Sequence, residues 1–217
     1  MISNPSNPFD YFSGVFGLNL DSQPERWQKA VARYRVLGIE SRVERFSATP
    51  TPENHHHGCT SSWRRMIAEA DVRGYERLLG LEDDAIFLDD TLAVLQTAIP
   101  EVLDQEWDLF FLGAAVWGQS FPFLPGCSVV QQCGPVTCAH AVAIHQRAYA
   151  RILADIPPVG TAFDEWMRQW LAIDQYFHRK IADGTFRALI VSPRVATQRE
   201  LCEYGELDLA LRERYVT

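Results

Sequence analysis

Three consecutive carboxylates, Glu82, Asp83 and Asp84, follow an apolar segment and carry the clearest chemistry in this sequence. The residues before them, 77–81, read RLLGL. Charge at the end of a buried strand is costly unless it is solvated, paired or bound to a cation. Mg²⁺ and Mn²⁺ prefer hard oxygen ligands, and one or two carboxylates together with phosphate groups often hold them. The triplet therefore indicates a solvated strand end, a helix cap or a site for a divalent cation.

The order of side chains on a strand separates the three acids. Successive side chains point to opposite faces, so Glu82 and Asp84 share one face and Asp83 takes the other. We therefore expect Glu82 and Asp84 to act as a pair.

Strands and helices alternate along the chain. Apolar runs predict strands at 14–20, 43–49, 77–84, 107–113 and 186–193. Periodic apolar residues and end signals predict helices at 21–38, 61–74, 89–103 and 163–184, and a strand leading into a helix at 138–156. Residues 50–58 are expected to be a loop, and residues 117–135 a long loop or an irregular hairpin. This order predicts an α/β/α sandwich with a mostly parallel central sheet, in which ligands bind at the carboxyl ends of strands.

Length and charge set further bounds. A length of 217 residues suits one domain, which we expect over 14–217. Residues 1–13, with two Asn-Pro steps, are expected to be a poorly ordered lead-in. A net charge of −8 argues against nucleic-acid binding, which needs a basic footprint. The sequence contains no run of about 18 apolar residues, so no transmembrane helix is predicted. The first residues lack a signal-peptide pattern. We therefore expect a cytoplasmic protein, with peripheral membrane contact left open.

The five cysteines are odd in number and contain no CxxC pair, so reduced thiols are expected. A disulfide between Cys127 and Cys133 stays open as the alternative.

Several stretches, in order, resemble glycosyltransferase family 25, the lipopolysaccharide-type and collagen-type sugar transferases. The matching stretches are VFGLNLDSQPERWQ, ERFSA, GCTSSW, LGLEDDAIF, AHAVAIHQRAYARIL and IDQYF, which together span about 14–200. Two positions depart from the family pattern. Trp63 stands where the family has His in Gly-Cys-x-x-Ser-His, and Gly80 stands where the segment before the acids has a larger residue.

The resemblance implies a GT-A-like nucleotide-binding fold, a nucleotide-sugar donor in the form of a UDP-sugar, and Mn²⁺ or Mg²⁺. It also implies inverting transfer of a hexose to a saccharide acceptor, such as a cell-surface glycan of the lipopolysaccharide type. By the same resemblance, Asp84 is the direct metal ligand, and Glu82 or Asp83 holds the donor ribose or a metal-bound water.

The residues that follow the first strand are candidates for holding the donor. Backbone groups of Leu18 and Leu20 are placed to hold a base, and Arg26 to reach a phosphate, with Asn19 and Asp21 beside them.

An inverting transferase needs a base for the acceptor hydroxyl. Asp174 in LAIDQYF is the first candidate, and Asp164 and Glu165 are the alternatives.

The histidines are weaker candidates. His140 and His145 are five apart, so on a strand they point to opposite faces, and one of them could approach the metal or the phosphates. The run His55–His57 suggests zinc only if further ligands converge on it, and its loop could instead cover the donor.

Two other functions stay open. A glycoside hydrolase would use two carboxylates without nucleotide or metal. A non-catalytic module with a transferase fold would bind nucleotide or glycan without turnover, because a fold alone does not establish activity.

Overall fold

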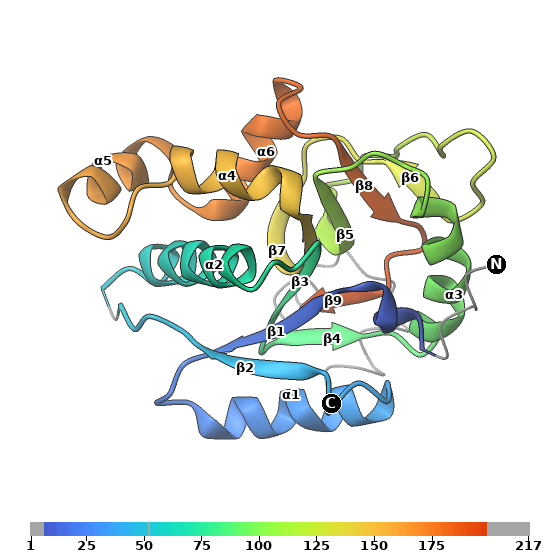
Figure 1. Cartoon of the computed structure of the whole chain (residues 1–217), viewed down its shortest axis with the longest axis horizontal. Coiled ribbons are helices and arrows are strands. Elements are labelled where there is room, and N and C mark those ends of the chain that lie inside the picture. Colours follow the sequence, from blue (N-terminus) through green and yellow to red (C-terminus); the bar gives the residue numbers. More distant parts are fainter. Residues whose placement is uncertain (1–6, 52, 199–217) are drawn as a thin grey trace.

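The computed structural model describes residues 7–51 and 53–198, and its centre is a seven-stranded sheet (Figure 1). The strand order is β2-β1-β3-β7-β5-β8-β6. The strands are β1 (Gly14–Asn19), β2 (Val43–Ser47), β3 (Arg77–Glu82), β5 (Leu109–Ala115), β6 (Val130–Gln132), β7 (Thr137–His145) and β8 (Ala188–Val191). β1, β2 and β3 are mutually parallel, β7 is antiparallel to both β3 and β5, and β8 is parallel to β5. Only β6 and β7 therefore run against the other strands of this sheet, which confirms the predicted mostly parallel α/β fold.

A second, two-stranded sheet pairs β4 (Ala85–Phe87) with β9 (Ala196–Gln198) in antiparallel register. Because β4 begins directly after Asp84, its pairing with β9 holds in place the chain that follows the three acids.

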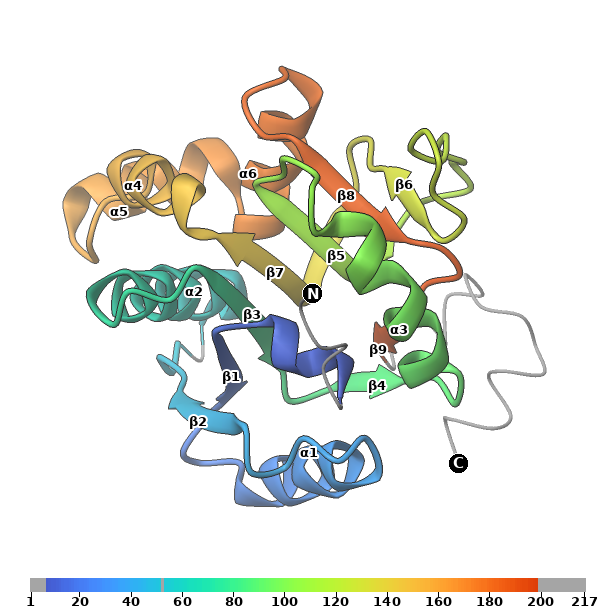
Figure 2. The ribbon, with the colours of Figure 1, turned by 45° about the vertical axis from the view of Figure 1, so that its right-hand side comes forward.

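Helices cover both faces of the central sheet (Figure 2). They are η1 (Pro8–Tyr11), α1 (Pro24–Val36), α2 (His55–Val72), α3 (Thr91–Val102), α4 (Gln146–Asp155), α5 (Thr161–Trp170) and α6 (Ile173–Ala182). One core cluster holds buried residues of α2, α4, α5 and α6, and a second holds those of η1, α1 and α3. Adjacent strand residues divide between them: Leu78 belongs to the first cluster and Leu79 to the second. The alternation of strand side chains thus produces the two helical layers.

The predicted lead-in over 1–13 is wrong for its second half. Asn7 caps η1 and accepts a hydrogen bond from the backbone N–H of Phe9. Phe9 and Phe12 are fully buried, and the ring of Phe9 meets the edge of Phe87. The Asn-Pro step that suggests disorder is here a helix start, because Asn caps and Pro fits the first turn. Residues 1–6 lie outside the described residues.

Two helix predictions need correction. α2 begins at His55, because the Asn54 side chain accepts hydrogen bonds from the N–H groups of His56 and His57. His55–His57 therefore lie on a helix and not on a loop. The single helix predicted over 163–184 is two helices, α5 and α6. Leu171 has a φ of 69°, which ends α5, and the N–H of Ile173 donates to the Thr60 hydroxyl as α6 starts.

The described cysteines, Cys59, Cys127, Cys133 and Cys138, are free thiols, so the alternative disulfide is not formed. Cys202 lies outside the described residues. None of the helices in the described part of the chain has the length and apolar character needed to cross a membrane.

Candidate active site

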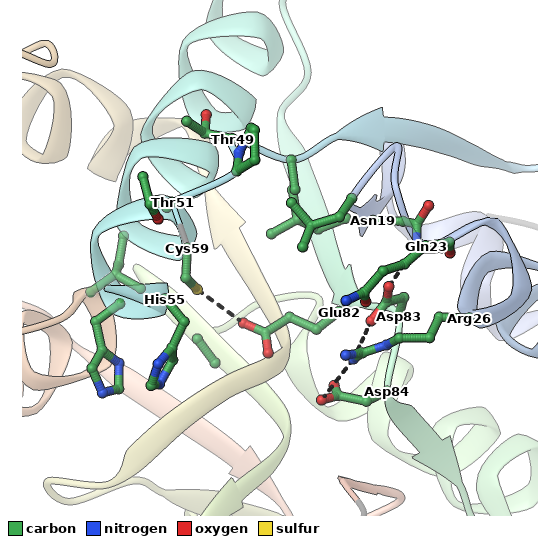
Figure 3. A pocket seen from close by; sticks show the side chains of 18 of the residues that line it. Asn19, Gln23, Arg26, Thr49, Thr51, His55, Cys59, Glu82, Asp83 and Asp84 are labelled. Carbon is green, nitrogen blue, oxygen red and sulfur yellow. Dashed lines mark hydrogen bonds and ion pairs between the residues drawn. The ribbon is translucent and has the colours of Figure 1, made fainter. Parts of the chain in front are cut away.

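A pocket of about 730 Å³ opens at the carboxyl ends of β1 and β3 (Figure 3). The turn from β1 to α1 and the connection from β2 to α2 supply one part of its wall. The β3–β4 turn, the start of β7 and the start of α6 supply the other parts. This is the edge where parallel sheets hold their ligands, so the sequence-based placement of the site is supported by the position of the pocket.

All three acids line this pocket, but they do not follow the alternation of a strand. β3 ends at Glu82, and Asp83 and Asp84 form a turn. The Asp83 N–H donates to the carbonyl of Leu18 at 3.1 Å, which closes the turn against β1. The buried Asp83 carboxylate accepts a 2.6 Å hydrogen bond from the Asn19 amide. Asp83 is therefore tied to the β1 side of the pocket.

Arg26 lies between the two aspartates. Its guanidinium is 2.5 Å from an oxygen of Asp83 and 3.2 Å from an oxygen of Asp84 (Figure 3). Arg26 lies in the first turn of α1, which begins at Pro24, a few residues after the end of β1. This places the predicted phosphate-binding arginine in the pocket, partly exposed and beside the acids.

Glu82 points away from Arg26, toward α2 (Figure 3). Its carboxylate accepts hydrogen bonds from the Trp63 indole N–H at 3.2 Å and from the Cys59 thiol at 3.5 Å. Burial, and then the nearby charge of Asp84, raise the pKa of Glu82 to about 7. Glu82 and Asp84 thus interact as like charges facing one pocket, and the guanidinium of Arg26 already lies beside Asp84.

The two departures from the family pattern meet at this point. Trp63 is fully buried, and a Cβ at Gly80 would lie 2.3 Å from its ring. Gly80 therefore makes room on β3 for the indole of Trp63 on α2. The indole in turn donates to Glu82, so Trp63 gives Glu82 a fixed hydrogen-bond donor.

Asn19 organises the β1 side from a buried position. Its side-chain N–H group donates to Asp83 and, at 3.1 Å, to the carbonyl of Gln23. Its carbonyl oxygen accepts two hydrogen bonds from Arg45, at 3.0 and 2.7 Å. The amide is thus occupied by protein groups, and Asn19 acts as a support for Asp83.

The other residues predicted to hold the donor divide between pocket and surface. Leu18 and Leu20 line the pocket. Asp21 is not among the lining residues, and its carboxylate is paired with Arg45 at 2.8 Å and accepts from the Ser47 hydroxyl at 2.6 Å.

Asp174 lines the pocket from the start of α6. One oxygen accepts the backbone N–H of Cys138 at 2.9 Å, and the other accepts the N–H of Gln175 at 2.8 Å. These bonds fix the carboxylate and link α6 to the start of β7. The alternative bases, Asp164 and Glu165, lie on α5 and are not pocket-lining residues.

The histidines have three different environments. His55 and His56 line the pocket at the start of α2, whereas His57 is 3.2 Å from Asp164 on α5. His140 is fully buried and does not line the pocket, and burial lowers its pKa to about 4. His145 caps α4. His140 and His145 are therefore structural, and the suggestion that one of them approaches a metal or phosphate is wrong.

Sequence reasoning missed the contacts of Cys59 and Trp63 with Glu82. Cys59 and Trp63 are four apart on α2 and share one face, but Cys59 precedes the helix predicted at 61–74, so the spacing gave no signal. It also missed Thr49 and Thr51, which line the pocket from the connection before α2.

The donor set fits a hard divalent cation. Glu82 and Asp84 both present carboxylate side chains to the pocket, and hard cations prefer such oxygen ligands; Asp84 is also paired with Arg26. Within residues 7–51 and 53–198, no three or more His, Cys, Asp or Glu side chains are grouped so as to hold a metal ion. A cation here would take its other ligands from phosphate and water, as Mg²⁺ commonly does.

Comparison with known proteins gives similarity of structure only, since no family model and no curated protein matches the chain. A glycosyltransferase involved in the glycosylation of the major capsid of PBCV-1 is 12% identical, with 82% of this chain and 80% of that chain covered and a TM-score of 0.48. A197 from STIV is 11% identical, with 85% and 84% covered and a TM-score of 0.47. The galactosyltransferase LgtC, in complex with donor and acceptor sugar analogs, is 12% identical, with 82% and 72% covered and a TM-score of 0.37. Likeness at this level does not extend to the site, so the chemistry of this chain rests on its own residues.

Proposed function

We propose that this protein is a metal-dependent, inverting glycosyltransferase that moves a hexose from a UDP-sugar to a saccharide acceptor. We further propose that the acceptor is a cell-surface glycan of the lipopolysaccharide type and that the reaction takes place in the cytoplasm. The observation that carries the proposal is the Glu82–Asp84 pair facing a large pocket at the ends of β1 and β3, with Arg26 beside it. The resemblance of the ordered motifs to glycosyltransferase family 25 supports the same reading.

The pocket offers separate places for the parts of a nucleotide sugar. Leu18 and Leu20 are proposed to hold the base and Asp83 the ribose, since these residues lie on the β1 side of the pocket. Arg26 is proposed to contact the diphosphate, for which a guanidinium is well suited. Mn²⁺ or Mg²⁺ would be held by Asp84 and Glu82. A volume of about 730 Å³ is within the range of pockets that hold ligands of this size.

The proposed reaction is a single displacement. The acceptor hydroxyl oxygen forms a bond to the anomeric carbon while the bond from that carbon to the diphosphate oxygen breaks, and the electron pair leaves with the diphosphate. The hydroxyl proton passes to the Asp174 carboxylate, which the two backbone N–H groups hold in place. A bound divalent cation would supply charge stabilisation for the leaving diphosphate. Arg26 would add its own positive charge at the same end of the pocket.

Calorimetric titration with UDP, with and without Mn²⁺, tests the metal and nucleotide assignments. We expect UDP to bind only with Mn²⁺, and we expect Asp84→Ala to abolish this binding while the protein stays folded. Asp104→Ala is the matched control, since Asp104 is an exposed carboxylate that does not line the pocket. Unchanged UDP affinity in Asp84→Ala would overturn the metal assignment.

Turnover separates the transferase from the alternatives. A transferase should hydrolyse the UDP-sugar slowly when no acceptor is present. Binding of UDP with no turnover of any UDP-hexose would indicate a binding module, and cleavage of an aryl glycoside without metal would indicate a hydrolase.

A further inference from the structure

The turn that ends β5 has an unusual residue at its tip. The carbonyl of Val116 accepts a 2.9 Å hydrogen bond from the N–H of Gln119, so Trp117 and Gly118 are the central residues of a β-turn. Their φ angles are 50° and 74°, both in the left-handed region. Such turns favour Asn, Asp and Gly at both central positions, because a bulky side chain is strained there. A tryptophan at this position calls for an explanation.

Burial does not explain why a tryptophan stands at this position, because Trp117 is 60% exposed. The ring is nevertheless held in place. Its indole N–H donates to the Thr137 hydroxyl at 2.8 Å, and the Gln119 side chain donates to the carbonyl of Pro135 at 3.3 Å. The polar edge of the indole is thus bound to the protein while most of its surface faces solvent. Strained residues fixed by their surroundings concentrate at ligand-binding sites.

The position of the ring relates it to the pocket. Ala115, at the end of β5, pairs with Thr137, at the start of β7. The residue after Thr137 is Cys138, which lines the pocket and donates its N–H to Asp174. Cys138 also has a left-handed φ, of 68°. Trp117, Thr137, Cys138 and Asp174 therefore form one connected series that ends at the proposed base.

The Trp117 end of this series lies at the end of β5, away from the end of β1, where the nucleotide is proposed to bind. In the sheet order β1-β3-β7-β5, the end of β5 is three strands from the end of β1, and both ends lie on the same edge because β5 runs with β3. The nucleotide and diphosphate are assigned to the β1 side. Trp117 does not itself line the pocket, and Thr137 connects it to Cys138 and Asp174, which do.

We propose that Trp117 forms an acceptor subsite, on which one sugar ring of the saccharide acceptor stacks. A hexose ring has an apolar face of C–H groups, and an exposed indole is the largest flat apolar surface that a side chain offers. The ring is fixed before the ligand arrives, so little side-chain entropy is lost on binding. This inference rests on the proposed transferase function for its biological meaning, and its binding test is independent of turnover.

The test uses the full chain labelled with 5-fluorotryptophan, and the Trp117 signal is assigned from its loss in Trp117→Phe. The probes are methyl glycosides of glucose, galactose and mannose, together with lactose and maltose, titrated in separate experiments by ¹⁹F NMR. We expect at least one of them to shift the Trp117 signal with a saturating curve. The Trp170 signal should not move, because Arg179 and Lys180 lie over that ring. Trp117→Ala should weaken the binding of that sugar at least tenfold, and Trp117→Phe less.

Phe123→Ala is the matched control, since Phe123 is an aromatic residue of the same loop and is 49% exposed. It should leave sugar binding unchanged. No shift of the Trp117 signal with any probe would overturn the subsite, and so would equal sugar affinity in Trp117→Ala and the unaltered protein. A shift caused by UDP and by no sugar would also overturn it, by assigning the ring to the nucleobase.

The outcomes for subsite and function are separate. Sugar binding at Trp117 without any binding of UDP would retain the subsite and remove the transferase. Metal-dependent UDP binding without sugar binding at Trp117 would remove the subsite and retain the proposed transferase.

Discussion

Asp174 shows how a single carboxylate is prepared for a role in the pocket. Its oxygens accept the N–H groups of Cys138 and Gln175, so its direction is set by two elements at once. An asparagine at this position keeps the size of the side chain and removes its ability to take a proton. We expect Asp174→Asn to lower turnover by about 10²- to 10⁴-fold, the usual contribution of a general base. UDP affinity, measured by calorimetry, should stay close to that of the unaltered protein.

Asp164→Asn is the control for this prediction, since Asp164 is an exposed carboxylate outside the pocket and the alternative base. It should keep full activity. Full activity in Asp174→Asn would remove Asp174 as the base, and loss in Asp164→Asn would transfer the role to that residue.

The sequence places Glu82, Asp84 and Asp174 near one another but does not give their contacts. The alternation argument misplaces Asp83, because the chain leaves the strand at Glu82 and Asp84 lies in a turn. The sequence predicts that Asn19 helps to hold the nucleotide sugar, whereas in the structure its side-chain amide donates a hydrogen bond to Asp83, 64 residues away. Such contacts depend on which strands become neighbours, and local spacing carries no information about that.

At the scale of elements, the packing of α2 on β3 depends on one glycine and one tryptophan. A Cβ at Gly80 would lie 2.3 Å from the Trp63 ring, which is too close for any side chain. We expect Gly80→Ala to lower the free energy of unfolding by about 1–3 kcal/mol, the usual cost of overpacking a core. In Trp63→Phe the smaller ring leaves room, so the double variant should be more stable than the sum of the single effects by about 1 kcal/mol or more.

Urea unfolding of the four proteins measures this coupling. Trp107→Phe provides the control, since Trp107 is buried in the other core cluster, with η1 and α3. Its effect should add to that of Gly80→Ala within about 0.5 kcal/mol. Additive effects for Trp63 and Gly80 would contradict the close contact between them.

Element boundaries follow from the sequence where the signals are local. Pro24 and Gly38 mark the ends of α1, and the apolar run before Asn19 marks β1. The break between α5 and α6 has no such signal. Leu171 adopts a left-handed φ there without a glycine or proline, while the N–H of Ile173 is bonded to Thr60 on α2. A tertiary contact accompanies this break, so periodicity alone predicts one helix.

At the scale of the whole molecule, the pocket-lining Glu82 and the buried His140 make stability depend on pH in opposite directions. Burial, and then the charge of Asp84, raises the pKa of Glu82 from 4.5 to about 7. The folded state therefore binds more protons than the unfolded chain between these values, and stability falls as pH rises. Burial lowers the pKa of His140 from 6.5 to about 4, so the unfolded chain binds more protons there and stability rises with pH. Each effect amounts to about 1.4 kcal/mol per pH unit.

We predict that the two effects offset each other between about pH 4.5 and 6.5, and that variants separate them. Relative to the unaltered protein, Glu82→Gln should gain about 1.4 kcal/mol per pH unit as pH rises through this window. His140→Gln should lose about the same amount per unit. Urea unfolding at several pH values gives both differences, and because each is taken against the unaltered protein at the same pH, the titration of other groups cancels.

Mn²⁺ links this prediction to the proposed metal site. A cation held by Glu82 and Asp84 stabilises the charged form of Glu82 and so brings its folded pKa down toward or below the ordinary value. Saturating Mn²⁺ should therefore abolish the loss of stability that Glu82 causes as pH rises above about 4.5, and should have no such effect in Glu82→Gln. Difference curves for Glu82→Gln that stay flat with pH would show that the carboxyl titrates normally in the fold. A pH-dependent difference that Mn²⁺ leaves unchanged would instead show a buried, repelled carboxylate that binds no metal.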